Sequence, residues 1–160
     1  MSTEVAALRH GGPLSGGVVE AWLERGRVVA RVRVARSVWA RFLGLMGRAQ
    51  LECDEGLWLV PCRSIHMFFM RAPIDVAFLD RDGVVVRAVA TMRPWSLRPV
   101  SVTLWPVRGA HSALELAPGT LERAGIEAGV RMHFRPPGER LPETVGAGSR
   151  HGAPVAAAGE

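Results

Sequence analysis

The sequence of 160 residues contains no lysine, no asparagine and no tyrosine, so all 20 of its basic residues are arginines. The codons of the three missing residue types are rich in A and T, which indicates that the arginine content reflects base composition before function. The net charge of +5 would suit a nucleic-acid partner only if the arginines formed one cluster. The strand predicted at residues 28–34 is rich in arginine, but we expect glutamates opposite it, and these would partly neutralise its charge. We therefore do not expect nucleic acid as a partner.

Two cysteines are too few for a disulfide framework, and no apolar run is long enough to span a bilayer. Residues 1–12 lack a basic start followed by an apolar segment, so we recognise no secretory signal. No CxxC, HxH or HExxH pattern occurs, and therefore no metal-binding motif is evident. These absences predict a cytoplasmic protein with reduced thiols, without a bound metal or another cofactor.

Alternating apolar and polar residues predict an antiparallel hairpin with strands at residues 18–24 and 28–34. If Glu24 faces Arg27 across the turn, Glu20 faces Arg31, and these pairs partly neutralise the arginines. Similar patterns predict further strands at residues 57–60, 65–70, 74–79, 84–91, 100–105, 113–116 and 130–134. Residues 80–83, with the sequence DRDG, are the expected turn of a second hairpin.

Two short helices are expected among these strands. Ser37 is the predicted N-cap of a helix that runs to Arg48, and Thr120 is the predicted cap of a helix over LERAG. Many short strands with two short helices predict a mainly β fold, a single compact antiparallel β-sandwich or barrel-like domain. We expect this domain at residues 18–135, between a flexible leader at residues 1–17 and a disordered tail, rich in Pro, Gly and Ala, at residues 136–160.

Several motifs follow one another in an order typical of one protein family. They are RFLGLMGR (41–48), DEGLWLV (54–60), SIHMFFM (64–70), PIDVAFLDRDGVVV (73–86), RPW (93–95) and LELAPGTLERAGIEAG (114–129). On these motifs the chain resembles the domain of unknown function 192 (DUF192) family over residues 27–134. The resemblance implies a compact, mostly antiparallel β-sandwich with short helices, and it implies no particular biochemical activity.

The resemblance also transfers the signature positions of the family to this chain. They are Arg41, Gly44, Leu45, Met46, Arg48, Gly56, His66, Met70, Pro73, Asp75, Gly83, Leu114, Glu115, Gly119 and Gly129. Two residues depart from the family pattern. Met67 stands where related sequences often have Thr, which removes a hydroxyl beside His66. Val130 stands where an acidic residue commonly follows the glycine, so a role for a carboxylate is lost there.

Asp75 interrupts a strand that is apolar on both faces, and it shares one face with Ala77 and Leu79. A buried carboxylate without a partner costs several kcal/mol, so we expect a basic partner from Arg41, Arg48 or His66. The simplest interpretation is an internal ion pair that joins a helix to the sheet. We favour it over a ligand-binding or catalytic role for Asp75.

His66 lies on the same predicted strand face as Cys62 and Met70, a set of soft ligands that suits Cu(I). On a straight strand Cys62 and His66 stand about 13 Å apart, which is too far to bind one ion. A hydrolase could use His66 with Asp75, but no GxSxG motif supplies a nucleophile. Trp95, in the proline-rich loop at residues 93–99, could frame a binding surface.

Three functional hypotheses remain open. The first is a non-enzymatic binding or accessory module, whose pocket holds a small polar ligand or a protein segment and is built from Arg41, Arg48, His66, Met70, Asp75, Trp95 and Glu115. The second is a hydrolase-type enzyme that uses His66 and Asp75 as an acid–base pair. The third is a purely structural Arg–Asp–Glu network without a site. The exposure of His66 and Asp75 distinguishes these hypotheses.

Overall fold

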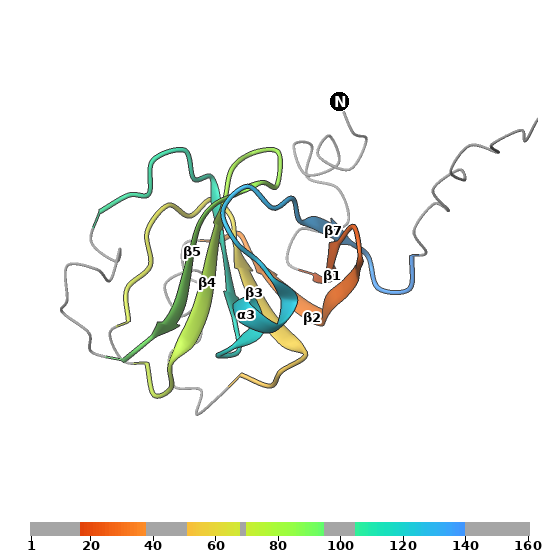
Figure 1. Ribbon diagram of the computed structural model, residues 1–160, viewed down its shortest axis with the longest axis horizontal. Helices are drawn as coiled ribbons and strands as arrows, with labels where there is room; N and C mark the ends of the chain where they lie inside the picture. Colours follow the sequence, from red (N-terminus) through yellow and green to blue (C-terminus); the bar gives the residue numbers. More distant parts are fainter. Residues whose placement is uncertain (1–16, 38–50, 68–69, 95–104, 140–160) are drawn as a thin grey trace, which may run out of the picture.

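The computed structural model describes residues 17–37, 51–67, 70–94 and 105–139 (Figure 1). These residues form seven strands and one short helix, namely β1 (Val18–Leu23), β2 (Gly26–Ala35), β3 (Glu55–Leu59), β4 (Ile74–Leu79), β5 (Val85–Met92), β6 (Ser112–Leu116), α3 (Thr120–Ala124) and β7 (His133–Arg135). The fold is mainly β, as the sequence predicts. No helix in the described part of the chain is long and apolar enough to cross a membrane.

All seven strands belong to one sheet, in the order β5-β4-β6-β3-β2-β1-β7. The pairs are antiparallel except for β2 and β3, which run parallel. Strand β6 inserts between β3 and β4, although it follows both in the sequence. The five residues of β6 and the six residues of β4 are all buried. A polar side chain on either strand must therefore find its partners inside the protein.

The segment that leads into β7 reaches both edges of the sheet. Val84 and Arg131 form an isolated antiparallel bridge beside β5. The amide of Met132 donates to the carbonyl oxygen of Gly83 at 2.9 Å. Strand β7 then pairs with β1 at the other end of the strand order. Because one short segment contacts both outer strands, the sheet is curled into a half-barrel (Figure 1).

Each face of the sheet carries its own hydrophobic cluster. The inner cluster lies inside the curl and combines residues of all seven strands with Leu121 of α3. In it, the ring of Trp58 stacks on Phe134 with a centroid distance of 3.8 Å. The outer cluster covers the opposite face and includes Leu57, Val76 and residues of the loop between β3 and β4. The side chains of β4 alternate between the two clusters.

The first hairpin forms where the sequence predicts it, but its ion pairs differ. Arg27 Nη1 lies 3.0 Å from Glu20 Oε1, and Arg31 Nη2 lies 2.9 Å from Glu52 Oε2. The predicted pairs of Glu24 with Arg27 and of Glu20 with Arg31 are therefore wrong. The register of β1 on β2 shifts twice in the middle of β1, which changes the residues that face each other.

Two other expectations are wrong. The described residues within 65–70 form no strand. Thr120 does not cap α3, because Gly119 holds the N-cap position and no side chain caps the helix. The Thr120 hydroxyl instead accepts a hydrogen bond from Arg123 Nη2 at 3.0 Å. Outside the described residues lie 38–48 of the other predicted helix, 100–104 of a predicted strand, the leader at 1–16 and the tail at 140–160.

Candidate functional site

Asp75, the second residue of β4, has an exposed fraction of 0%. Ala77 and Leu79, on the same strand face, belong to the inner cluster, as the alternation predicts. The Oδ1 atom of Asp75 accepts the amide hydrogen of Thr91 at 2.8 Å, and Oδ2 accepts that of Leu121 at 3.0 Å. Main-chain amides thus satisfy both oxygens of the carboxylate, and Asp75 joins β4 to β5 and to α3.

The amide of Thr91 reaches Asp75 because β5 is irregular at this point. Beyond the pair of Ile74 with Met92, two residues of β5 stand opposite Asp75, where a regular ladder has one. Thr91 adopts a φ of 53°, in the left-handed region that non-glycine residues rarely adopt. The extra residue turns an amide out of the ladder and toward the carboxylate.

Of the three basic partners expected for Asp75, the described residues test only His66. His66 is exposed, and the residues on either side of it pack in the outer cluster. Asp75 faces the inner cluster, so the sheet separates its carboxylate from the loop that carries His66. The other two candidates, Arg41 and Arg48, lie outside the described residues.

Glu115 of β6 is the second buried carboxyl group among the predicted site residues, with an exposed fraction of 5%. It is paired in the sheet with Leu57 and Val76, which both belong to the outer cluster. Burial raises the pKa of Glu115 to about 8. Its Oε2 atom has no hydrogen-bond partner among the described residues. Glu115 is therefore mostly protonated at neutral pH.

Asp75 and Glu115 do not meet in one pocket, because they lie on opposite faces of the sheet. Met70 is buried in the outer cluster, whereas His66 is exposed. No group of three or more His, Cys, Asp or Glu side chains that could hold a metal ion is found within the described ranges. The remaining residues of the predicted pocket lie outside those ranges and stay a prediction, namely Arg41, Arg48 and Trp95.

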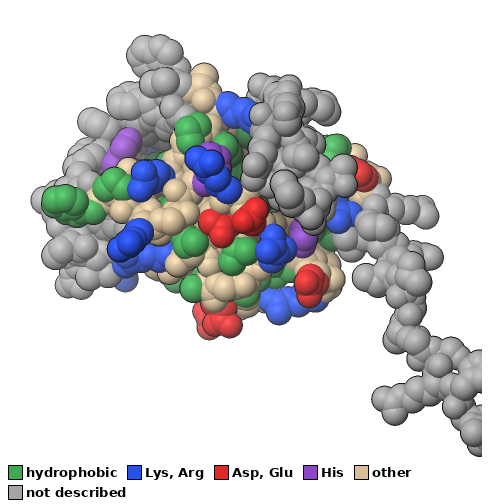
Figure 2. Space-filling model, turned by 90° about the horizontal axis from the view of Figure 1, so that it is seen from above, with side chains coloured by type: hydrophobic (Ala, Val, Ile, Leu, Met, Phe, Trp, Pro, Cys, Tyr) green, Lys and Arg blue, Asp and Glu red, His purple; other side chains and the backbone are tan. Residues whose placement is uncertain are grey.

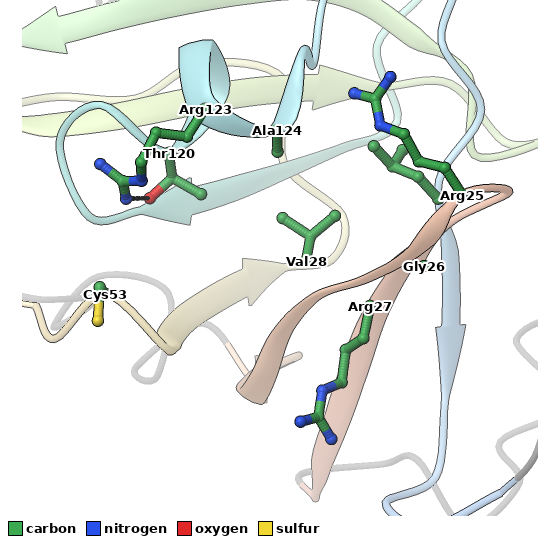
Figure 3. Close-up of a pocket in the computed structure, with 9 residues that line it drawn as sticks. Arg25, Gly26, Arg27, Val28, Cys53, Thr120, Arg123 and Ala124 are labelled. Atoms are coloured by element: carbon green, nitrogen blue, oxygen red, sulfur yellow. Dashed lines mark hydrogen bonds between the residues drawn. The ribbon is translucent and has the colours of Figure 1, made fainter.

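A cleft that the sequence analysis missed lies between the β1–β2 hairpin and α3 (Figure 3). It has a volume of about 350 Å³. Its walls are residues 23 and 25–28 of the hairpin, Cys53 before β3, and Thr120, Arg123 and Ala124 of α3. Figure 3 shows Val28 and Ala124 facing each other between these walls. Three distant segments form the cleft, so no local motif marks it.

Three of the residues that line this cleft, which we call the arginine cleft, are arginines. Arg25, Arg27 and Arg123 line it, and no carboxylate is among the described residues that do. On the face shown in Figure 2, arginine and acidic side chains are interspersed. The arginine cleft therefore combines a concave shape with an excess of one sign of charge.

Two relatives with the same name, UPF0127 protein, are similar to this chain in sequence. A UPF0127 protein of Thermococcus sibiricus is 31% identical over 122 residues, which cover 72% of this chain and 74% of that protein. A UPF0127 protein of Pyrococcus furiosus is 32% identical over 108 residues, which cover 64% of this chain and 85% of that protein. Neither name specifies an activity.

Two crystal structures have a similar fold. A protein of unknown function from Novosphingobium aromaticivorans matches with a TM-score of 0.61 and 28% identity, over 76% of this chain and 89% of that one. A putative transcription regulator from Sinorhizobium meliloti matches with a TM-score of 0.57 and 25% identity, over 72% of this chain and 91% of that one. The sequence profile of DUF192, described as Uncharacterized ACR, matches residues 21–134. The chain therefore belongs to the DUF192 family.

Proposed function

We propose that this protein is a non-enzymatic binding module that holds a small polar ligand in the arginine cleft. The observation that carries the proposal is the cleft itself, a space of about 350 Å³ between the first hairpin and α3. Ligand sites in proteins are concave and combine apolar walls with a few polar groups. Leu23, Val28 and Ala124 supply apolar walls, and the Thr120 hydroxyl and the arginines supply polar groups.

The alternative of a hydrolase with His66 and Asp75 as its acid–base pair has less support. A general base must come within about 3 Å of the proton that it abstracts. Asp75 has an exposed fraction of 0%, and both of its oxygens already accept amide hydrogens. His66 is exposed on the loop whose neighbouring residues pack on the other face of the sheet. The geometry of Asp75 favours a structural role.

We also infer a cytoplasmic location and a ligand or protein partner in place of nucleic acid. Neither Cys53 nor Cys62 forms a disulfide, and Cys53 is exposed, which suits a reducing compartment. Arg27 and Arg31 of β2 form ion pairs with glutamates, so part of the arginine charge is already compensated. Cell fractionation and a mobility-shift assay with duplex DNA test these two inferences, and membrane recovery or tight DNA binding would contradict them.

The position of the exposed Cys53 in the cleft wall provides a direct test of binding. In a Cys62→Ser variant, Cys53 is the single thiol of the chain. Small sugars, amino acids, nucleosides, carboxylates and phosphates are first screened for a rise in the thermal unfolding midpoint. We expect the stabilising compounds to slow the alkylation of Cys53 by an uncharged maleimide, as measured by mass spectrometry.

The control is alkylation of the same variant in denaturant, where no compound should change the rate. Because the maleimide carries no charge, the arginines do not attract it or repel it. The proposal fails if compounds raise the unfolding midpoint without slowing alkylation of Cys53, or if no compound does either.

A further inference from the structure

The charge around the arginine cleft indicates what kind of ligand it accepts. We propose that the cleft binds a small organic anion with phosphate or carboxylate groups, held between Arg25 and Arg123. The inference rests on the proposed function, because it names the ligand class of the same site. Guanidinium groups bind both kinds of anion through two parallel hydrogen bonds, so both share one recognition chemistry.

Arg25, in the turn between β1 and β2, has no ion pair or hydrogen bond among the described residues. Its guanidinium packs on the C-cap of α3, where Nη2 lies 2.6 Å from the position that a Cβ on Gly125 would occupy. The end of the helix thus holds the side chain beside the cleft (Figure 3). The charge of Arg25 remains uncompensated by any described carboxylate.

Arg123 lines the cleft near the other end of α3, where its Nη1 atom lies 2.9 Å from the position that a Cβ on Gly119 would occupy, and Figure 3 shows Ala124 between it and Arg25. The Nη2 atom of Arg123 donates to Thr120 Oγ1 at 3.0 Å, and its Nη1 donates to the Pro118 carbonyl oxygen at 3.4 Å. Both acceptors are uncharged, so these bonds fix the orientation of the guanidinium and leave its positive charge available. The Thr120 hydroxyl accepts from Arg123 and can still donate its own hydrogen to an anion.

Arg27 contributes less, because its charge is already paired. Its Nη1 lies 3.0 Å from Glu20 Oε1, and Glu20 is buried. In Figure 3 the Arg27 side chain extends away from Val28 and Ala124. The two remaining cationic groups, Arg25 and Arg123, line the cleft from the two ends of α3. This arrangement fits a molecule with two acidic groups more closely than a molecule with a single acidic group.

The test compares the affinities of pyrophosphate and malonate for variants that lose one positive charge. Isothermal titration at constant ionic strength is made with wild type, Arg25→Gln, Arg123→Gln and the control Arg33→Gln. Arg33 is exposed on β2 and does not line the cleft. We expect each cleft variant to weaken binding by about tenfold or more, since it removes a charged hydrogen bond. The control should stay within about twofold.

Thermal unfolding midpoints establish that each variant is folded. If Arg25→Gln does not fold because its side chain packs on α3, the result for Arg123→Gln decides the test. Stronger binding of pyrophosphate assigns a phosphate ligand, whereas stronger binding of malonate assigns a carboxylate ligand. For either anion, affinity should fall as sodium chloride is raised.

The inference is wrong if neither anion binds wild type, or if Arg33→Gln weakens binding as much as the cleft variants do. If only uncharged compounds protect Cys53 from alkylation, the proposal of an anionic ligand is wrong, whereas the proposed binding function is supported. If no compound protects Cys53, both proposals fail.

Discussion

The Oδ2 atom of Asp75 accepts the amide hydrogen of Leu121 at 3.0 Å, and this bond fastens helix α3 to strand β4. The helix spans only Thr120–Ala124, too short to be stable by itself. Asp75 and the apolar contact of Leu121 therefore hold the wall of the arginine cleft in place. A residue on the inner face of the sheet thus positions a site that it does not line.

We expect Asp75→Asn to lower the free energy of unfolding by about 2–3 kcal/mol. Asparagine keeps the shape but has one acceptor oxygen, so one of the two amides, that of Thr91 or of Leu121, loses its partner. Urea denaturation measures the change. The exposed Asp82→Asn is the matched control, for which we expect less than about 0.5 kcal/mol. Equal effects of the two substitutions would contradict the role assigned to Asp75.

The buried Glu115 predicts a dependence of stability on pH. Its pKa is raised by burial from 4.5 to about 8 in the folded protein. The contribution of protonated Glu115 to the free energy of unfolding is therefore fully present below the unfolded pKa of 4.5. It is lost as the pH rises through the folded pKa of about 8, because the folded protein then has to bury a charged carboxylate. Within this window each pH unit costs up to about 1.4 kcal/mol.

Glu115→Gln removes the titrating proton while keeping the shape of the side chain. We expect the difference in unfolding free energy between this variant and wild type to grow in favour of the variant from pH 5 to pH 8. Chemical denaturation at several pH values measures it. A constant difference across that range would show that Glu115 does not titrate as described.

Gly83 has a φ of +79°, and a Cβ at this position would lie 2.6 Å from the Met132 carbonyl oxygen. We expect Gly83→Ala to destabilise the protein by about 2 kcal/mol or more, because the new Cβ strains the backbone and clashes with the Met132 carbonyl oxygen. Gly129→Ala is the control, because Gly129 has a φ of +93° with nothing within 4 Å of its Cβ position. Denaturation that shows the same loss for both variants would exclude a contribution from the contact with Met132.

The strained backbone of Thr91 offers a stabilising substitution. Thr91→Gly keeps the amide that donates to Asp75 and removes the Cβ that disfavours a φ of 53°. Relief of strain offsets the entropy of glycine, so we expect a change between zero and about 1 kcal/mol in favour of the variant. Thermal and urea unfolding measure it. A loss of more than about 1 kcal/mol would indicate that the Thr91 side chain stabilises the bulge.

The sequence predicts those features of the fold that depend on local pattern. Alternation places Asp75 on the face of Ala77 and Leu79, because side chains of a strand point to its two faces in turn. The pattern of residues 65–70 predicts a strand, but Ile65 and Met67 are buried in a loop without a ladder. A short apolar stretch of sequence therefore predicts that its residues are buried more reliably than it predicts that they pair in a sheet.

The partners of the candidate site could not be predicted in the same way. The carboxylate of Asp75 is satisfied by main-chain amides, which every residue except proline carries and which leave no trace in the sequence. The position of Glu115 on the opposite face follows from the register of β6 on β4, which local pattern does not determine. The arginine cleft depends on the meeting of a hairpin turn with a distant helix.

Residues 129–135 form hydrogen bonds with both outer strands of the described sheet, at Val85 of β5 and at Glu20–Trp22 of β1. A chain that ends before this segment would leave two strand borders unprotected at once, with their amides and carbonyls ready to pair with a neighbouring molecule. A chain that ends at Ala128 should therefore self-associate more than the full chain does.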